Sequence, residues 1–138
     1  MNTEILYHIL LSFIFGAVIG LERQLKGKVV GVRTTSLICT GTMLFIYLGT
    51  TLDGDKARVL GQVITGIGFL GAGSILAKEG KVSGLTSASV VWSVAAIGSA
   101  VGLGRYDLGA IMTITTIGIL IGVQWIEDIF DKLTSKKD

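Results

Sequence analysis

The 138-residue sequence contains no proline, one cysteine and one histidine. Without proline, a break in any helix would have to come from one of the 20 glycines. A single cysteine, Cys39, excludes an intrachain disulfide, and one cysteine with one histidine offers no zinc-binding set. The sequence also shows no Ser/His/Asp set and no phosphate-binding loop. These absences argue against an enzyme.

Charge is also scarce. Only 16% of the residues are charged, whereas a soluble domain carries about 25%. Half of the residues are hydrophobic and the mean hydropathy is +0.71, which indicates a membrane protein. Twelve Lys and Arg against ten Asp and Glu give a net charge of +2 without a long basic run, so nucleic acid is not an expected partner.

Five stretches are long and uncharged enough to cross a lipid bilayer, which requires about 20 largely apolar residues. The pattern predicts an all-α, polytopic transmembrane bundle of five helices that forms one domain over residues 1–138. No Lys or Arg precedes the first stretch and no A-x-A motif follows it, so it is not expected to be a cleaved signal. The predicted spans are 5–21, 34–52, 59–77, 82–104 and 108–126, followed by a tail over 127–138.

The basic residues predict the orientation of these helices. Nine of the twelve lie in the segments 22–33 and 78–81 and in the tail, and Lys56, Arg58 and Arg105 lie on the other side. Because cytoplasmic loops carry the excess of Lys and Arg, the N-terminus is expected outside and the C-terminus in the cytoplasm.

The segment TGIGFLGAGSI, residues 65–75, contains a G-x-G-x-x-G pattern. A dinucleotide-binding turn would need a preceding strand and a following acidic residue, and this context is missing. As a helix, the segment instead has one face of small and polar residues and one of large apolar residues. We expect the small face, with Arg58 and Gln62, to pack against the bundle and the apolar face to meet lipid. The glycines of that face are Gly61, Gly66, Gly68 and Gly73.

Small residues mark two further helices. Gly16 and Gly20 have the GxxxG spacing of closely packed membrane helices. The span 82–104 is small on nearly all sides and is expected at the centre of the bundle. Trp92 in that span has small neighbours and is interpreted as a packing residue more readily than as part of a site.

Polar groups near the membrane are the candidates for function, because an ionisable side chain there is unfavourable and commonly faces the bundle interior. For most of them the alternative to a functional role is anchoring at the membrane interface, with the charged end of the side chain reaching water. Glu22 can also form a structural ion pair with Lys26 one turn later. His8 is expected to be a satisfied or a surface histidine rather than a metal ligand or proton relay. The polar residues near the membrane that are candidates for function are Glu22, Arg23, Arg33, Arg58, Gln62 and Gln124.

Four segments of the sequence resemble the membrane domain of the MgtC/SapB family over nearly the whole chain. They are GAVIGLERQ at 16–24, GVRT at 31–34, DKARVLGQVITGIGFLGAGSIL at 55–76 and GLTSASVVWSVAAIGSAVGLG at 84–104. The resemblance implies a multi-pass protein of the bacterial inner membrane, in a family associated with growth at low magnesium and with virulence. It also implies that the C-terminal ACT-type domain of larger relatives is missing here. The family motifs cover Glu22, Arg23, Gln24, Arg33, Arg58, Gln62, Thr86 and Trp92.

Two functions are compatible with these residues. The first is a regulator in magnesium homeostasis that binds another membrane protein, which the tight small-residue faces favour. The second is a transporter or channel for Mg²⁺ or another ion, formed by a homo-oligomer. No cofactor is expected, although Glu22 is a possible Mg²⁺ ligand. The expected partners are the lipid bilayer, a second copy of the chain in a dimer, and another membrane protein in the regulator alternative.

Overall fold

A computed structural model describes residues 3–52, 55–78 and 81–134 of the chain. In these residues it contains five helices and one two-stranded hairpin, so the predicted all-α fold with five helices is confirmed. The helices are α1 (Thr3–Leu25), α2 (Val32–Thr51), α3 (Lys56–Gly73), α4 (Leu85–Gly102) and α5 (Tyr106–Thr134).

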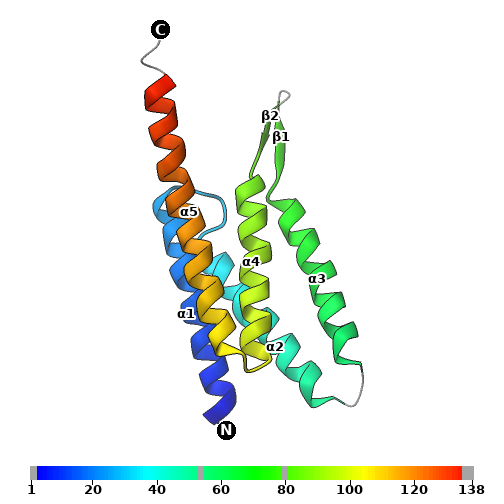
Figure 1. The fold of residues 1–138 in the computed structure, drawn as a ribbon. Helices are drawn as coiled ribbons and strands as arrows, with labels where there is room; N and C mark the ends of the chain where they lie inside the picture. Colours follow the sequence, from blue (N-terminus) through cyan, green and yellow to red (C-terminus); the bar gives the residue numbers. More distant parts are fainter. Residues whose placement is uncertain (1–2, 53–54, 79–80, 135–138) are drawn as a thin grey trace.

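Helix α4 lies at the centre of the bundle, as its small residues predicted. It packs against all four other helices, and Val91, Val94 and Ile97 on it are almost fully buried. Figure 1 shows that the end of α1, the start of α2, the hairpin and the end of α5 gather at one end of the molecule, which we call the hairpin end. Helix α3 lies at the edge of the bundle (Figure 1).

Four of the helices, α1, α2, α4 and α5, are long and apolar enough to cross a membrane. The apolar part of α3, Ala57–Gly73, is shorter than these. A helix of 17 residues has a length of about 26 Å, slightly less than the hydrocarbon thickness of a bilayer of about 30 Å.

The hairpin replaces part of the predicted third and fourth spans. Helix α3 ends at Gly73 rather than at residue 77, and strands β1 (Leu76–Lys78) and β2 (Lys81–Ser83) pair antiparallel, with Leu76 opposite Ser83. Gly84 then precedes α4 with a φ of 88°, a left-handed conformation that favours glycine. Charges at residues 78–81 ended the predicted spans, but hydropathy alone does not show that the flanking residues form strands.

The other helix boundaries differ because hydropathy locates the apolar segment and not the end of the helix. Helix α1 continues to Leu25 and α5 continues to Thr134, beyond the predicted ends at residues 21 and 126. The predicted tail is therefore helical up to Thr134, and 135–138 lie outside the described residues. Charged residues such as Glu127 and Lys132 are good helix formers and extend the helix past its apolar part.

Glycines bring the backbones of α1 and α4 against α2. A Cβ atom at Gly16 would lie 2.8 Å from the Thr35 carbonyl oxygen, and one at Gly20 would lie 2.5 Å from the Val32 Cα. On α4, a Cβ at Gly102 would lie 2.5 Å from the Met43 carbonyl oxygen. Both helices therefore approach α2 more closely than any larger residue would allow.

The orientation of α3 is the reverse of the one predicted. Two large residues that were expected to meet lipid face the bundle: Ile67 is 9% exposed and belongs to the core, and Val63 packs against that core. A Cβ at the four predicted packing glycines, Gly61, Gly66, Gly68 and Gly73, would meet nothing within 4 Å. Because α4 already supplies small residues, the large side chains of α3 fill the space beside it.

We predict that Gly20→Ala destabilises the bundle by about 1–3 kcal/mol, since the added methyl group forces α1 and α2 apart. Gly118→Ala is the matched control, because a Cβ there meets nothing within 4 Å. Thermal unfolding in detergent measures both. Equal midpoints for the two variants would contradict the close contact between α1 and α2.

Candidate functional site

The structure separates the predicted site residues into three places. Glu22, Arg23, Gln24, Arg33 and Thr86 lie at the hairpin end, near the end of α1 and the starts of α2 and α4. Arg58 and Gln62 lie near the start of α3, at the opposite end of the bundle (Figure 1). Trp92 lies between these two groups, on α4.

Two of these residues, Glu22 and Arg23, form a largely buried cluster with Lys26 and Gln124. We call it the Glu22 cluster. The Arg23 guanidinium donates from Nη2 to Glu22 Oε1 at 2.9 Å, and Lys26 Nζ lies 2.8 Å from the same oxygen. Lys26 also donates to the Gln124 side chain of α5. The side chains of Arg23 and Glu22 are only 3% and 10% exposed. The predicted ion pair between Glu22 and Lys26 is thus present. Arg23 makes a second ion pair with Glu22, and Gln124 accepts a hydrogen bond from Lys26.

A cavity of about 450 Å³ opens beside this cluster. Its polar lining comes from α1, α4, α5 and the segment after α1, and it includes both Arg23 and Thr86. The charged and polar residues that line it are Arg23, Lys28, Thr86, Ser87, Gln124, Glu127 and Asp128. The family motif at Thr86 and the one at Arg23 therefore border the same cavity, although they are far apart in the sequence.

Gln24 has a structural contact of its own. Its side-chain oxygen accepts a hydrogen bond from the Val32 N–H at 3.4 Å, and thereby serves one of the free donors at the start of α2. The N-cap residue of α2, Gly31, has no side chain to do so. Arg33 is exposed in the first turn of α2, and its side chain makes no ion pair within the part of the chain that the structure describes.

His8 is buried and satisfied, which is one of the two expected environments, and it is not at the surface. It is 2% exposed, and its Nδ1 lies 2.9 Å from the Glu4 carbonyl oxygen. The rings of Tyr47 and Tyr106 contact it edge-on, with centroids 5.2 Å away. This packing encloses the imidazole among aromatic rings.

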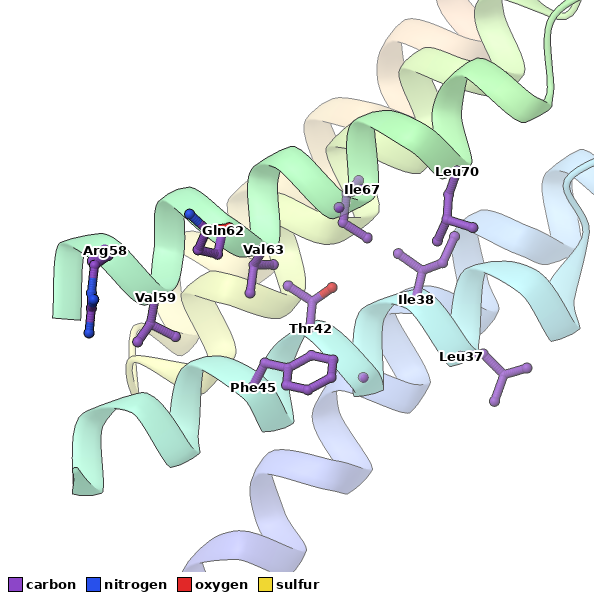
Figure 2. A pocket seen from close by; sticks show the side chains of 12 residues that line it. Leu37, Ile38, Thr42, Phe45, Arg58, Val59, Gln62, Val63, Ile67 and Leu70 are labelled. Atoms are coloured by element: carbon purple, nitrogen blue, oxygen red, sulfur yellow. The ribbon is translucent and has the colours of Figure 1, made fainter. Parts of the chain in front are cut away.

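Arg58 and Gln62 line a groove between α2 and α3, which we call the α2–α3 groove. Its volume is about 780 Å³ and most of its lining is apolar. Figure 2 shows Arg58 at the end where α3 begins and Leu37 and Leu70 toward the other end. Both polar side chains are exposed rather than packed in the bundle, which follows from the reversed orientation of α3.

Trp92 is 53% exposed and borders two hollows between α3 and α4. Its Cδ1 lies 3.9 Å from the position of a Cβ at Gly71. The indole therefore packs over the side of α3 that faces α4, where small neighbours on both helices leave room for it.

Metal binding at Glu22 is disfavoured by its partners. Within the described ranges, no group of three or more His, Cys, Asp or Glu side chains is placed to hold a metal ion. A Mg²⁺ ion at Glu22 would approach a carboxylate that already contacts two cations, Arg23 and Lys26. Those cations repel a divalent ion and compete for the same oxygens.

The helices and their buried polar groups define a multi-pass helical membrane protein. The sequence pattern of the MgtC family matches residues 9–129, and the chain belongs to this family. The resemblance found in the four sequence segments is thereby confirmed. No solved structure matches the chain significantly.

Several relatives are similar to the chain over most of its length. "Putative magnesium transporter YhiD" of Escherichia coli is 37% identical over 97% of this chain, and "Protein SrpB" of Synechococcus elongatus is 36% identical over 92%. "Protein MgtC" of Salmonella typhimurium is 38% identical over 83%. The alignments cover 64% of YhiD, 82% of SrpB and 51% of MgtC, so YhiD and MgtC are considerably longer.

We predict that Glu22→Gln lowers the free energy of unfolding by about 2 kcal/mol, because it leaves the buried Arg23 without its carboxylate. Asp107→Asn is the control, since it removes the exposed pair of Arg105 and Asp107, whose side chains are 58% and 61% exposed. An exposed pair contributes at most about 1 kcal/mol. Chemical unfolding in detergent measures both variants, and a larger loss for Asp107→Asn would contradict the assignment.

Proposed function

We propose that the chain is a regulator in bacterial magnesium homeostasis that acts by associating with other membrane proteins. The observation that supports this most is the α3 outer face, formed by Gly61, Thr65, Gly68 and Ala72. A Cβ at either glycine would meet nothing within 4 Å, and Thr65 and Ala72 are exposed. The Thr65 hydroxyl donates to the Gly61 carbonyl oxygen at 3.0 Å, so the four side chains of this face are small and close to the helix. The exposed Phe69 follows Gly68, and Gly68 and Ala72 also border the hollow beside Trp92.

In a membrane, such a face favours association with another helix. Small residues let two helix backbones approach closely, and the gain comes from packing rather than from removal of apolar surface from water. Lipid tails pack less well against a flat face of small residues. The partner is another membrane protein or a second copy of this chain, and the homodimer expected from the sequence stays a prediction.

The distribution of charge supports an orientation with the N-terminus outside and the C-terminus in the cytoplasm of an inner membrane. The basic segment after α1, the hairpin and the end of α5 lie together at the hairpin end (Figure 1). Because cytoplasmic segments carry the basic excess, the hairpin end is the cytoplasmic end in this proposal. The cavity beside the Glu22 cluster then opens on the cytoplasmic side.

The alternative is a Mg²⁺ transporter or channel formed by a homo-oligomer, and the observation in its favour is the similarity to YhiD, which is named a magnesium transporter. A transport pathway for a divalent cation requires carboxylates or other oxygen ligands along it. In this chain the carboxylate of the Glu22 cluster is neutralised by Arg23 and Lys26. This charge balance favours the regulator.

Reconstitution tests the alternative directly. We expect proteoliposomes containing the purified chain and an entrapped Mg²⁺-sensitive dye to show no more Mg²⁺ uptake than protein-free vesicles. Uptake above that background, reduced in a folded Arg58→Ala variant, would support the transporter and contradict the proposal.

Association through the α3 outer face is tested by photo-crosslinking in bacterial membranes. A crosslinking residue at Gly68 is expected to capture a membrane protein, whereas the same residue at Gly118 on α5 is not. A Cβ at either position would meet nothing within 4 Å, and circular dichroism checks that both variants are folded. Capture of equal amounts of the same protein from both positions, or from neither, would argue against this surface.

A further inference from the structure

We propose that the α2–α3 groove binds one phospholipid, with the phosphate of an anionic headgroup at Arg58 and an acyl chain along the groove. This site is separate from the α3 outer face, and its occupancy does not depend on the regulatory function proposed above.

The dimensions of the groove fit an acyl chain. Its lining on α3 runs from Arg58 to Leu70, and 13 helical residues cover about 18 Å. One leaflet of the hydrocarbon core is about 15 Å thick, so the groove is as long as the acyl chain of one leaflet. Its volume of about 780 Å³ lies in the range of pockets that hold small ligands, about 300–1,000 Å³.

The walls of the groove are apolar along most of its length. Helix α2 contributes Ile38 and Phe45, and α3 contributes Val63, Ile67 and Leu70 (Figure 2). Gly41 on α2 and Gly66 on α3 also line it, and a Cβ at either glycine would meet nothing within 4 Å. These two glycines keep the groove open where side chains from both helices would otherwise fill it.

One end of the groove is polar and positively charged. Arg58 and Gln62 lie one helical turn apart, and Arg58 is in the first turn of α3, at the depth of the membrane interface if α3 spans the bilayer. The Arg58 side chain makes no ion pair with any residue that the structure describes. A guanidinium binds phosphate through two parallel hydrogen bonds, and the Gln62 amide can donate a third.

The combination of one charged end with an apolar remainder identifies the occupant. A phospholipid has this same division, with its phosphate at the interface and its tail in the hydrocarbon core. A helix from a second copy would fill the apolar part but would leave Arg58 without an anion. The charge complementarity of the groove therefore favours the lipid over the helix.

Native mass spectrometry of the full chain in mild detergent, titrated with phosphatidylglycerol, tests the proposal. We expect the wild-type chain to retain one phosphatidylglycerol and to bind phosphatidylcholine more weakly, because its choline group competes for the phosphate. Inorganic phosphate at the same concentration is not expected to displace the lipid, because it lacks the acyl chain.

Three variants distinguish this site from general lipid adhesion, after circular dichroism has shown that each is folded. Gly66→Leu fills the groove and is expected to abolish retention of the lipid. Arg58→Gln is expected to weaken phosphatidylglycerol binding about tenfold, the effect of losing a charge-assisted contact, and to remove the preference over phosphatidylcholine. Gly118→Leu on α5 adds the same bulk away from the groove and is expected to behave as the wild type.

Two results would overturn the proposal. The first is undiminished retention of phosphatidylglycerol by Gly66→Leu, which would place the lipid elsewhere on the surface. The second is a wild-type mass of two chains without lipid, together with a crosslink from Phe45 to the other copy, which would make a second copy the occupant.

Discussion

The close approach of two helices to the backbone of α2 is the constraint on which the rest of the structure depends. Gly16 and Gly20 of α1 face the first half of α2, and Gly98 and Gly102 of α4 face its middle. Glycine at these positions gives the helices van der Waals contact along their backbones, which is the main source of stability where lipid is as apolar as the side chains. Residues at the contacts are fully buried, including Ile19, Cys39 and Met43.

This packing explains the position of α3. With α4 already presenting small residues, α3 fits beside it through large side chains such as Ile67. Most of its own small residues remain on the outside, and Gly71, which lies against α4, is the exception. Amphipathic periodicity identified the two faces of α3 in the sequence. It did not determine which face turns inward, because in a membrane protein both a small-residue face and an apolar face can pack against a helix. A second GxxxG pattern, at Gly98 and Gly102, is the signal in the sequence that marks the side of α4 in contact with α2.

The polar residues divide into those whose surroundings the sequence could predict and those whose surroundings depend on the fold. The pairing of Glu22 with Lys26 follows from their spacing along one helix. The contact from Lys26 to Gln124 joins residues far apart in the chain and requires the packing of α5 on α1. Local sequence likewise gives no sign that Arg58 borders a groove, since half of that groove comes from α2. The hairpin was missed because hydropathy does not distinguish a short strand from the end of an apolar helix.

The orientation of α3 can be measured by disulfide formation within one chain, in a background in which Cys39 is replaced by serine. A Cβ at Gly71 would lie 3.6 Å from the Ala88 carbonyl oxygen, whereas one at Gly73 would meet nothing within 4 Å. Gly71 and Ala88 also line the same hollow between α3 and α4, whereas Gly73 does not, so cysteines at 71 and 88 are expected to be a closer pair than those at 73 and 88. The account predicts rapid crosslinking of the first pair and none of the second. Crosslinking of the second pair without the first would contradict it.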